Sequence, residues 1–94
     1  MVWLAPGESV KYLYMPEVNI RALNPNSEMR VLVWAKEEGE MFTKMEPVLY
    51  VETEIGVIAV QAPQAGILRK KLVKEGMPVK VGQILAFFTE PRGV

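Results

Sequence analysis

The sequence predicts an all-β domain folded as a sandwich or barrel, and three observations support this class. Seven prolines and seven glycines divide the 94 residues into short stretches, and these residue types are typical of turns. Between the turns lie short runs rich in Val, Ile, Leu, Tyr and Phe, as expected for strands. No window keeps the i, i+3, i+4, i+7 apolar spacing of a helix for three turns, so helices are expected to be minor.

Residues 31–60 contain three of the expected strands. Val31–Trp34 follows an Asn-Pro-Asn turn and ends before a Glu-Gly turn at residues 38–39. Val48–Val51 and Val57–Val60 stand on either side of a short polar stretch, a pattern that is typical of a hairpin. After residue 60, apolar runs follow at residues 67–68, 72–73 and 84–88, and the turn signals around them are Pro63 through Gly66, Glu75-Gly76 and Gly82.

An internal repeat links the two halves at an offset of 37 residues, because residues 36–48 resemble residues 73–85. Phe42 corresponds to Val79, Val48 to Leu85, and Glu46 to Gln83. Two similar β units, neither able to bury its apolar face alone, predict a sandwich with quasi-two-fold symmetry. The two halves are expected to meet around residues 49–72.

Composition excludes several function classes. Eleven basic and 11 acidic residues give a net charge of zero, so no electrostatic argument favours nucleic acid or a membrane surface. The sequence has no cysteine and no histidine, which removes Cys/His zinc sites and imidazole acid–base catalysis. We therefore expect a non-enzyme with no catalytic residues and no metal.

The sequence also predicts a cytoplasmic location. The first ten residues lack the charged leader and long apolar stretch of a secretory signal. No apolar run approaches the ~18–20 residues that a membrane helix needs, so we expect no membrane insertion.

The stretch Glu52-Thr53-Glu54-Ile55-Gly56 is predicted to form the tip of the hairpin. A mirror-type turn over Ile55-Gly56 would force positive φ on a β-branched residue, which sterics resist. A type I turn over Glu54-Ile55 avoids this, so we expect positive φ at Gly56 and an exposed Ile55. Glu52 and Glu54 face the same side, and we interpret them as a solvated hairpin end rather than an acid–base pair.

These residues and their neighbours give the sequence a resemblance to the biotinyl/lipoyl domain family over roughly residues 18–90. Lipoyl-type members carry Glu-Thr-Asp-Lys-Ala at a hairpin tip, where this chain has Glu52 to Gly56, and then Ala-Pro and a glycine, here Ala62-Pro63 and Gly66. The flanking turns match at residues 39–45 and 75–85. The resemblance implies a flattened β-barrel, also called a barrel-sandwich hybrid.

Two departures from the family pattern carry the functional prediction. Ile55 stands where the family has the lysine that holds lipoate or biotin, and isoleucine has no nucleophilic atom. Lys44, Lys70 and Lys71 are too far along the chain to replace it, so no lipoyl or biotinyl cofactor is expected. In the first half, Met45 replaces a turn glycine that Gly82 keeps in the second half.

We therefore predict a non-catalytic, lysine-less domain that acts as an interaction or structural module. An exposed Ile55 fits either simple drift or a tip that docks a protein partner through apolar contact. One alternative is a carrier-like accessory subunit of a 2-oxoacid dehydrogenase, carboxylase or glycine cleavage complex. Another is an adaptor related to membrane-fusion transporter components, although no coiled-coil segment interrupts the chain.

The domain is predicted to span residues 18–91, with an N-terminal extension at 1–17 and a short tail at 92–94. Tyr12 and Tyr14 alternate with Leu13, so the extension is expected to add a strand. That strand covers an edge of the same barrel, which we favour, or pairs with another copy in a homodimer.

Three further features have simpler interpretations than a binding site. Arg69-Lys70-Lys71 is expected to place its charges on alternating faces of a strand and to solvate its edge. Trp34 is expected to pack at the core edge. Four methionines are interpreted as gap-fillers in the core rather than as copper ligands; they are Met29, Met41, Met45 and Met77.

Overall fold

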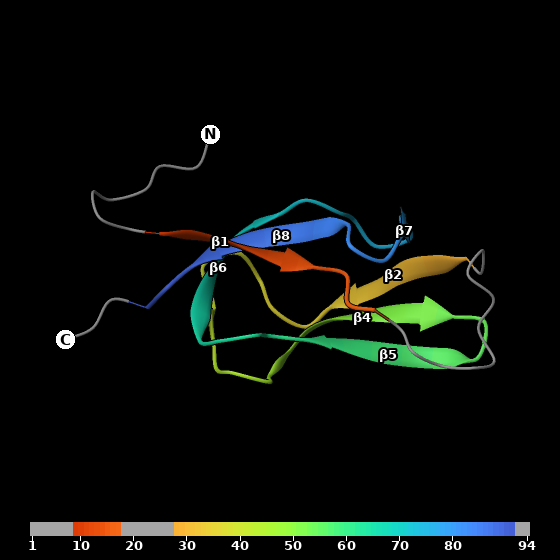
Figure 1. Ribbon diagram of the computed structural model, residues 1–94, viewed down its shortest axis with the longest axis horizontal. Coiled ribbons are helices and arrows are strands. Elements are labelled where there is room, and N and C mark those ends of the chain that lie inside the picture. The colour runs from red at the N-terminus through yellow and green to blue at the C-terminus, as the bar shows by residue number, and fades with distance from the viewer. Residues whose placement is uncertain (1–8, 18–27, 92–94) are drawn as a thin grey trace.

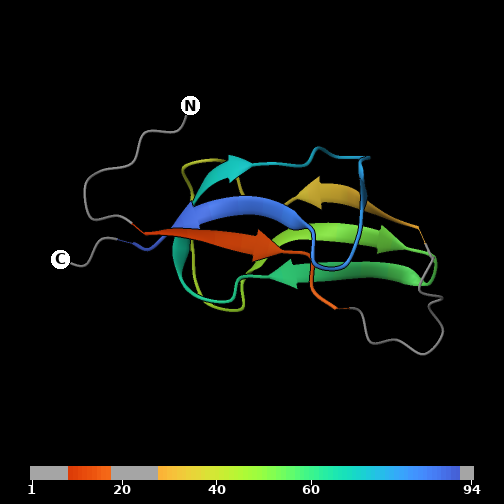
Figure 2. The same cartoon turned by 45° about the horizontal axis from the view of Figure 1, so that its top comes forward.

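Two four-stranded antiparallel sheets lie one over the other in the computed structural model (Figures 1 and 2), which describes residues 9–17 and 28–91. Sheet A has the strand order β1-β8-β6-β3 and sheet B the order β5-β4-β2-β7. The strands are β1 (Val10–Tyr14), β2 (Met29–Trp34), β3 (Met41–Phe42), β4 (Pro47–Thr53), β5 (Gly56–Gln61), β6 (Gly66–Lys71), β7 (Pro78–Val79) and β8 (Ile84–Thr89). The predicted all-β barrel-sandwich class is confirmed. Residues 9–17 and 28–91 contain no helix long and apolar enough to span a membrane.

The sheets are related by the predicted quasi-two-fold symmetry. An offset of 37 residues carries β2 onto β6, β3 onto β7 and β4 onto β8. Pairing follows the same rule, because β4 lies between β5 and β2 just as β8 lies between β1 and β6. Even the bulges correspond, one between Val31 and Val33 and the other between Leu68 and Lys70.

β1 completes this symmetry within the chain. It pairs antiparallel with β8, with Leu13 opposite Ala86. After β1, Met15 N donates to Gln83 O (2.8 Å) and Met15 O accepts from Gly82 N (2.9 Å). After β5, Ala62 N likewise donates to Glu46 O (2.9 Å), and Ala62 O accepts from Met45 N (2.8 Å). The division of the chain at residues 17/18 stays a prediction, and the proposed tail at 92–94 lies outside the described residues.

The core lies between the sheets and is built by alternate residues of the strands. Phe42 and Val79, which the repeat pairs, are both 3% exposed, and Val48 and Leu85 are fully buried. The Phe42 and Phe88 rings meet edge to face, with centroids 5.3 Å apart. The other buried apolar residues are Leu13, Met15, Met29, Val31, Trp34, Leu49, Val51, Val60, Ala62, Leu68, Val73 and Ala86.

Trp34 joins the two halves at the edge of the core, as predicted. It is 8% exposed, and its indole Nε1 donates to Val73 O at 3.0 Å. The Lys71 ammonium lies 5.3 Å from the centroid of the indole ring, within the range of a cation–π contact. Lys71 also pairs with Glu37, at 3.0 Å between Nζ and Oε2.

The core role predicted for the methionines is wrong for three of the four. Met29 is buried, but Met41, Met45 and Met77 are 62%, 57% and 43% exposed. Met77 has a local role instead, because its Sδ accepts a hydrogen bond from Lys74 N at 3.1 Å. At the equivalent turn, the Glu40 carboxylate accepts a hydrogen bond from Glu37 N at 2.8 Å.

Two predictions about residues 67–73 are corrected by the bulge in β6. The runs at 67–68 and 72–73 were expected as separate strands, but one strand covers Gly66–Lys71. Charged residues interrupt the apolar pattern inside this strand, which hid its length. The bulge between Leu68 and Lys70 also breaks the strict alternation expected for the three cations.

Glu46 closes the turn before β4 with both a hydrogen bond and an ion pair. Its Oε1 accepts from Thr43 N at 2.9 Å, and its Oε2 lies 2.8 Å from Lys36 Nζ. The hydrogen bond from Lys36, followed by that from Thr43 N, lowers the pKa of the Glu46 carboxyl. The hydrogen bond to Glu46 in turn raises the pKa of the Lys36 ammonium group.

Besides the β4–β5 hairpin, four turns in residues 9–17 and 28–91 place a residue at positive φ, and one of them is strained. The angles are +94° at Gly39, +87° at Gly76 and +84° at Gly82. At the position equivalent to Gly82, Met45 has a φ of 72°. A side chain in this region costs roughly 1–2 kcal/mol, which a glycine would not incur.

Replacing Met45 by glycine is expected to stabilise the domain. Relief of the left-handed strain, less the added backbone freedom of glycine when unfolded, gives a gain of about 0.5–1 kcal/mol. Chemical denaturation measures the change in the free energy of unfolding. Lys44→Gly is the matched control, since Lys44 has no positive φ, and its free energy of unfolding should fall. A loss of stability in Met45→Gly would contradict the strain.

Candidate functional site

The tip of the β4–β5 hairpin lies at the end of sheet B where β4 finishes (Figure 1). Thr53 pairs with Gly56, so Glu54 and Ile55 are the two central residues of the turn. Gly56 has a φ of +144°, whereas Glu54 and Ile55 do not have positive φ. A mirror-type turn is thereby excluded, and the expected positive φ at Gly56 is confirmed. Ile55 is 48% exposed, also as expected.

Thr53 holds the turn in this shape. It is 7% exposed because it continues the inward row of β4 that contains Val51. Its hydroxyl donates to Gly56 O at 2.7 Å and accepts from Ile55 N at 3.3 Å. The side chain of residue 55 takes no part in these bonds, so the backbone of the tip does not depend on its identity.

Replacing Thr53 by valine is expected to loosen the tip. Valine keeps the volume but leaves Gly56 O and Ile55 N without their hydroxyl partner, at a cost of about 1–2 kcal/mol. Chemical denaturation measures the loss, and amide exchange at Ile55 reports the local opening. Thr43→Val is the control, because Thr43 is exposed and its hydroxyl makes one long hydrogen bond among the described residues, to Glu46 at 3.4 Å. Equal effects in the two variants would argue against the role of Thr53.

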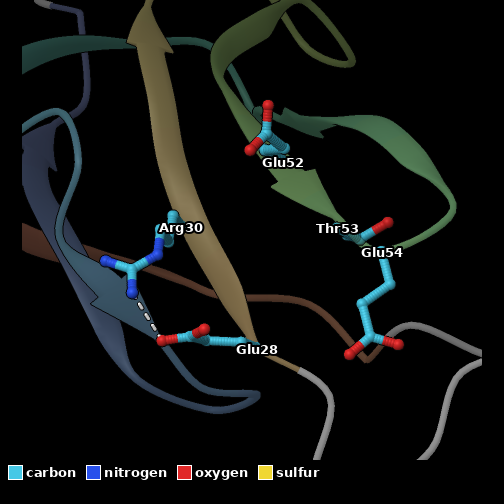
Figure 3. Close-up of a pocket in the computed structure, with 5 residues that line it drawn as sticks. All are labelled: Glu28, Arg30, Glu52, Thr53 and Glu54. Atoms are coloured by element: carbon cyan, nitrogen blue, oxygen red, sulfur yellow. Dashed lines mark hydrogen bonds and ion pairs between the residues drawn. The ribbon is translucent and has the colours of Figure 1, made fainter.

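A shallow pocket of about 180 Å³ lies beside the tip (Figure 3). Its lining residues come from β2, the adjoining residue 28 and the hairpin, and they are Glu28, Arg30, Glu52, Thr53 and Glu54. Arg30 lies directly opposite Glu52 across the strands. Its guanidinium nevertheless donates to Glu28 Oε1 at 2.6 Å and to Gly76 O at 3.2 Å.

The pocket therefore carries surplus negative charge. Glu28 offsets Arg30, while Glu52 and Glu54 have no ion-pair partner among residues 9–17 and 28–91. Both carboxylates are exposed, so they keep the hydration that an acid–base pair in an enzyme usually loses. In the described residues no group of three or more acidic side chains is arranged to hold a metal ion. The arrangement suits contact with a cationic group at a solvated surface.

The structure brings together only some of the candidate site residues that were predicted from the sequence. Glu52, Thr53 and Glu54 line the pocket, but Ile55 does not. Lys70 and Lys71 lie in β6 of the other sheet, and Lys44 precedes β4 at the end remote from the tip. Sequence reasoning missed Glu28 and Arg30, because their place beside the hairpin depends on the pairing of β2 with β4. The two-residue spacing of Thr53 from Val51 could have identified it as inward-facing.

Comparison with known proteins agrees with this geometry. The family model of biotin/lipoyl domains, described as "Biotin-requiring enzyme", matches residues 19–88. Over 64 residues the chain is 39% identical to the dihydrolipoyllysine-residue acetyltransferase component of an acetoin cleaving system from Pseudomonas putida. Over 80 residues it is 34% identical to the dihydrolipoyllysine-residue succinyltransferase component of the 2-oxoglutarate dehydrogenase complex from Staphylococcus saprophyticus.

These matches cover most of the chain but little of the relatives. They include 68% and 84% of this chain, but only 17% and 19% of the two proteins. Among solved structures, a single-chain, multi-domain long-chain acyl-CoA carboxylase superposes with a TM-score of 0.65 over 97% of this chain and 8% of its own. At 23% identity that likeness shows the fold alone. The match to the family model over residues 19–88 shows that the chain belongs to the biotin/lipoyl domain family.

Proposed function

We propose that this domain is not lipoylated or biotinylated and serves as a protein-docking module without a catalytic step of its own. The observation that carries the proposal is Ile55 at the centre of the β4–β5 turn, where the resemblance to lipoyl-type domains predicts an attachment lysine. Attachment to a lysine needs its amine as nucleophile, and an aliphatic side chain has none. The hairpin keeps the backbone of a carrier tip without its reactive group.

The relatives support a partner within a multi-enzyme complex. Both of the compared proteins are named as components of larger systems, and both names describe a dihydrolipoyllysine-residue acyltransferase. A domain of the same family that lacks the lysine would act through contacts with other proteins rather than through a bound acyl group. This favours a second, more specific function as an accessory of an acyl-transfer complex, in which the domain occupies a carrier's place without carrying an acyl group.

The tip supplies the proposed contact. Ile55 is half exposed on a turn whose backbone is fixed by Thr53. A rigid apolar side chain loses little conformational freedom when it binds. Glu52 and Glu54 flank it with carboxylates that have no ion-pair partner in the described part of the chain, so a partner with cationic groups around an apolar pocket would complement it.

Affinity purification from the native host tests the docking function. The tagged domain should retain subunits of an acyl- or carboxyl-transfer complex, and Ile55→Glu should lose them because it places a third carboxylate in the apolar contact. Met41→Glu is the matched control, since Met41 is 62% exposed but lies in β3 of the other sheet. Retention of the same subunits by Ile55→Glu would overturn a docking tip, and absence of such subunits from the unaltered domain would overturn the accessory function.

A further inference from the structure

The outer surface of sheet B carries a contiguous apolar patch, which we name the aliphatic face. It consists of Leu32, Val33, Tyr50, Val57 and Ala59. Leu32, Val33 and Val57 are 43%, 41% and 54% exposed, and Tyr50 lies opposite both Val33 and Ala59 in the sheet. Exposed apolar side chains gathered on one face are a mark of a protein contact surface.

The equivalent surface of sheet A has a different chemistry, and we name it the aromatic-basic face. It consists of Tyr12, Tyr14, Lys70 and Phe87, with Phe87 opposite both Tyr12 and Lys70. Tyr12 and Tyr14 are 47% and 52% exposed, and their ring centroids lie 6.3 Å apart. Leu13 between them points inward and is 3% exposed.

Because internal symmetry relates the two sheets, the two faces have equivalent backbones and differ in their side chains. Each face contains one of the two equivalent bulges, which lies at Leu32 and Val33 in sheet B and at Arg69 and Lys70 in sheet A. The backbone needs no particular side chain at these outward positions, because the core is filled from the other side of each strand. Folding accounts for Arg69, which hydrogen-bonds the buried Thr89 hydroxyl. It does not explain why Leu32, Val33 and Lys70 are exposed.

Charge shows which surface fits the aliphatic face. Glu52 lies on the same side of sheet B as Val57, which it pairs with, and has no ion-pair partner in the described residues. Lys70 likewise has none in the described part of the chain, whereas Arg69 Nε donates to Thr89 Oγ1 at 2.8 Å. Two aromatic-basic faces would bring like charges together, but unlike faces would place Lys70 near Glu52 and the tyrosines on the aliphatic side chains.

We propose that the aliphatic face binds the aromatic-basic face of a second copy of this chain. Such a contact joins different surfaces of the two copies, so a dimer still has one free face of each kind. Assembly then continues beyond the dimer, either to a closed ring or to an open chain. Ile55 and Glu54 of the proposed tip contact lie outside both faces, and Glu52 is the one residue that the two contacts share.

Sedimentation equilibrium of the purified chain, from micromolar to millimolar concentration, tests the proposal. The weight-average mass should rise with concentration past twice the monomer mass of 10.6 kDa. High salt should lower it, because the Lys70–Glu52 attraction between copies is screened. Lys70→Glu and Leu32→Glu should each weaken association at least tenfold, whereas Lys44→Glu, a charge reversal outside both faces, should behave like the unaltered chain.

Mixing the two disabled variants gives the most specific result. Leu32→Glu keeps its aromatic-basic face and Lys70→Glu keeps its aliphatic face, so together they should form a one-to-one dimer that does not grow. Val57→Glu provides a second aliphatic-face variant if Leu32→Glu fails to fold, which circular dichroism reveals. A chain that stays monomeric, one that stops at a dimer of identical faces, or a mixture that stays monomeric would each overturn the proposal.

Discussion

Gly66→Ala is expected to destabilise the domain by about 3 kcal/mol, the upper range for forcing extra volume into a packed core. A β-carbon at this position would lie 2.6 Å from Phe88 Cδ2, 3.0 Å from Phe42 Cζ and 3.0 Å from Thr89 O. Phe88 is 1% exposed and packs against Phe42, so neither ring has room to turn away. The backbone oxygen of Thr89 belongs to β8, the strand that pairs with β6.

Gly56→Ala is the control that distinguishes a steric clash of the added β-carbon from backbone strain. Nothing lies within 4 Å of a β-carbon at Gly56, but its φ of +144° is unfavourable for alanine. A cost of about 1 kcal/mol is expected from the backbone alone. Chemical denaturation of both variants gives the two free energies of unfolding. If Gly66→Ala cost no more than Gly56→Ala, the close approach of β6 to the two phenylalanines would be wrong.

Ile55→Lys is expected to convert the domain from one that accepts no lipoyl group into one that a lipoate–protein ligase modifies fully. The turn is held by the Thr53 hydroxyl and by Gly56, so the new lysine should reach solvent from an unchanged backbone. Substitution at a half-exposed position should change stability by less than about 0.5 kcal/mol. Intact-mass spectrometry after co-expression with the ligase measures the conversion.

Val57→Lys is the matched control for this gain of modification. It places an equally accessible lysine two residues further on, in β5, where Val57 is 54% exposed. A ligase that requires the lysine at the centre of the turn should leave this variant unmodified. Modification of Val57→Lys without modification of Ile55→Lys would mean that residue 55 is not the attachment position.

The sequence predicted the features of the fold that depend on local chemistry. The glycine at 56 marked the turn because a β-branched Ile55 cannot adopt positive φ, and the structure has its positive angle at Gly56. The 37-residue repeat placed Phe42 and Val79 in equivalent buried positions because both follow a Glu-Gly turn by the same spacing. The same comparison marked Met45 as a departure, and its left-handed φ explains why a glycine suits that position.

Features that depend on strand register were not predictable. The bulges beside Val33 and Lys70 add a residue that the two-residue alternation cannot reveal. Arg30 reaches the tip pocket only because β2 pairs with β4, and its bond to Glu28 rather than to Glu52 is decided by side-chain geometry. The exposure of Met41 was missed for a related reason, since a two-residue strand carries too little pattern to identify its inner face.

Several predictions await experiments of the kinds described. Among them are the cytoplasmic location, a homodimer through residues 1–17, the absence of a bound cofactor and the docking of Ile55. The last two are linked through one residue, because a modified tip would present the prosthetic group rather than the isoleucine to a partner.

Mass spectrometry of the tip peptide tests the central claim most directly. The protein is purified from its native host grown with lipoate and biotin, digested, and searched for the peptide that contains residues 52–56. This peptide is expected at its unmodified mass alone, with no lipoyl or biotinyl adduct on it or on any lysine of the chain. An adduct at any of these sites would contradict the assignment of this domain as an unmodified docking module.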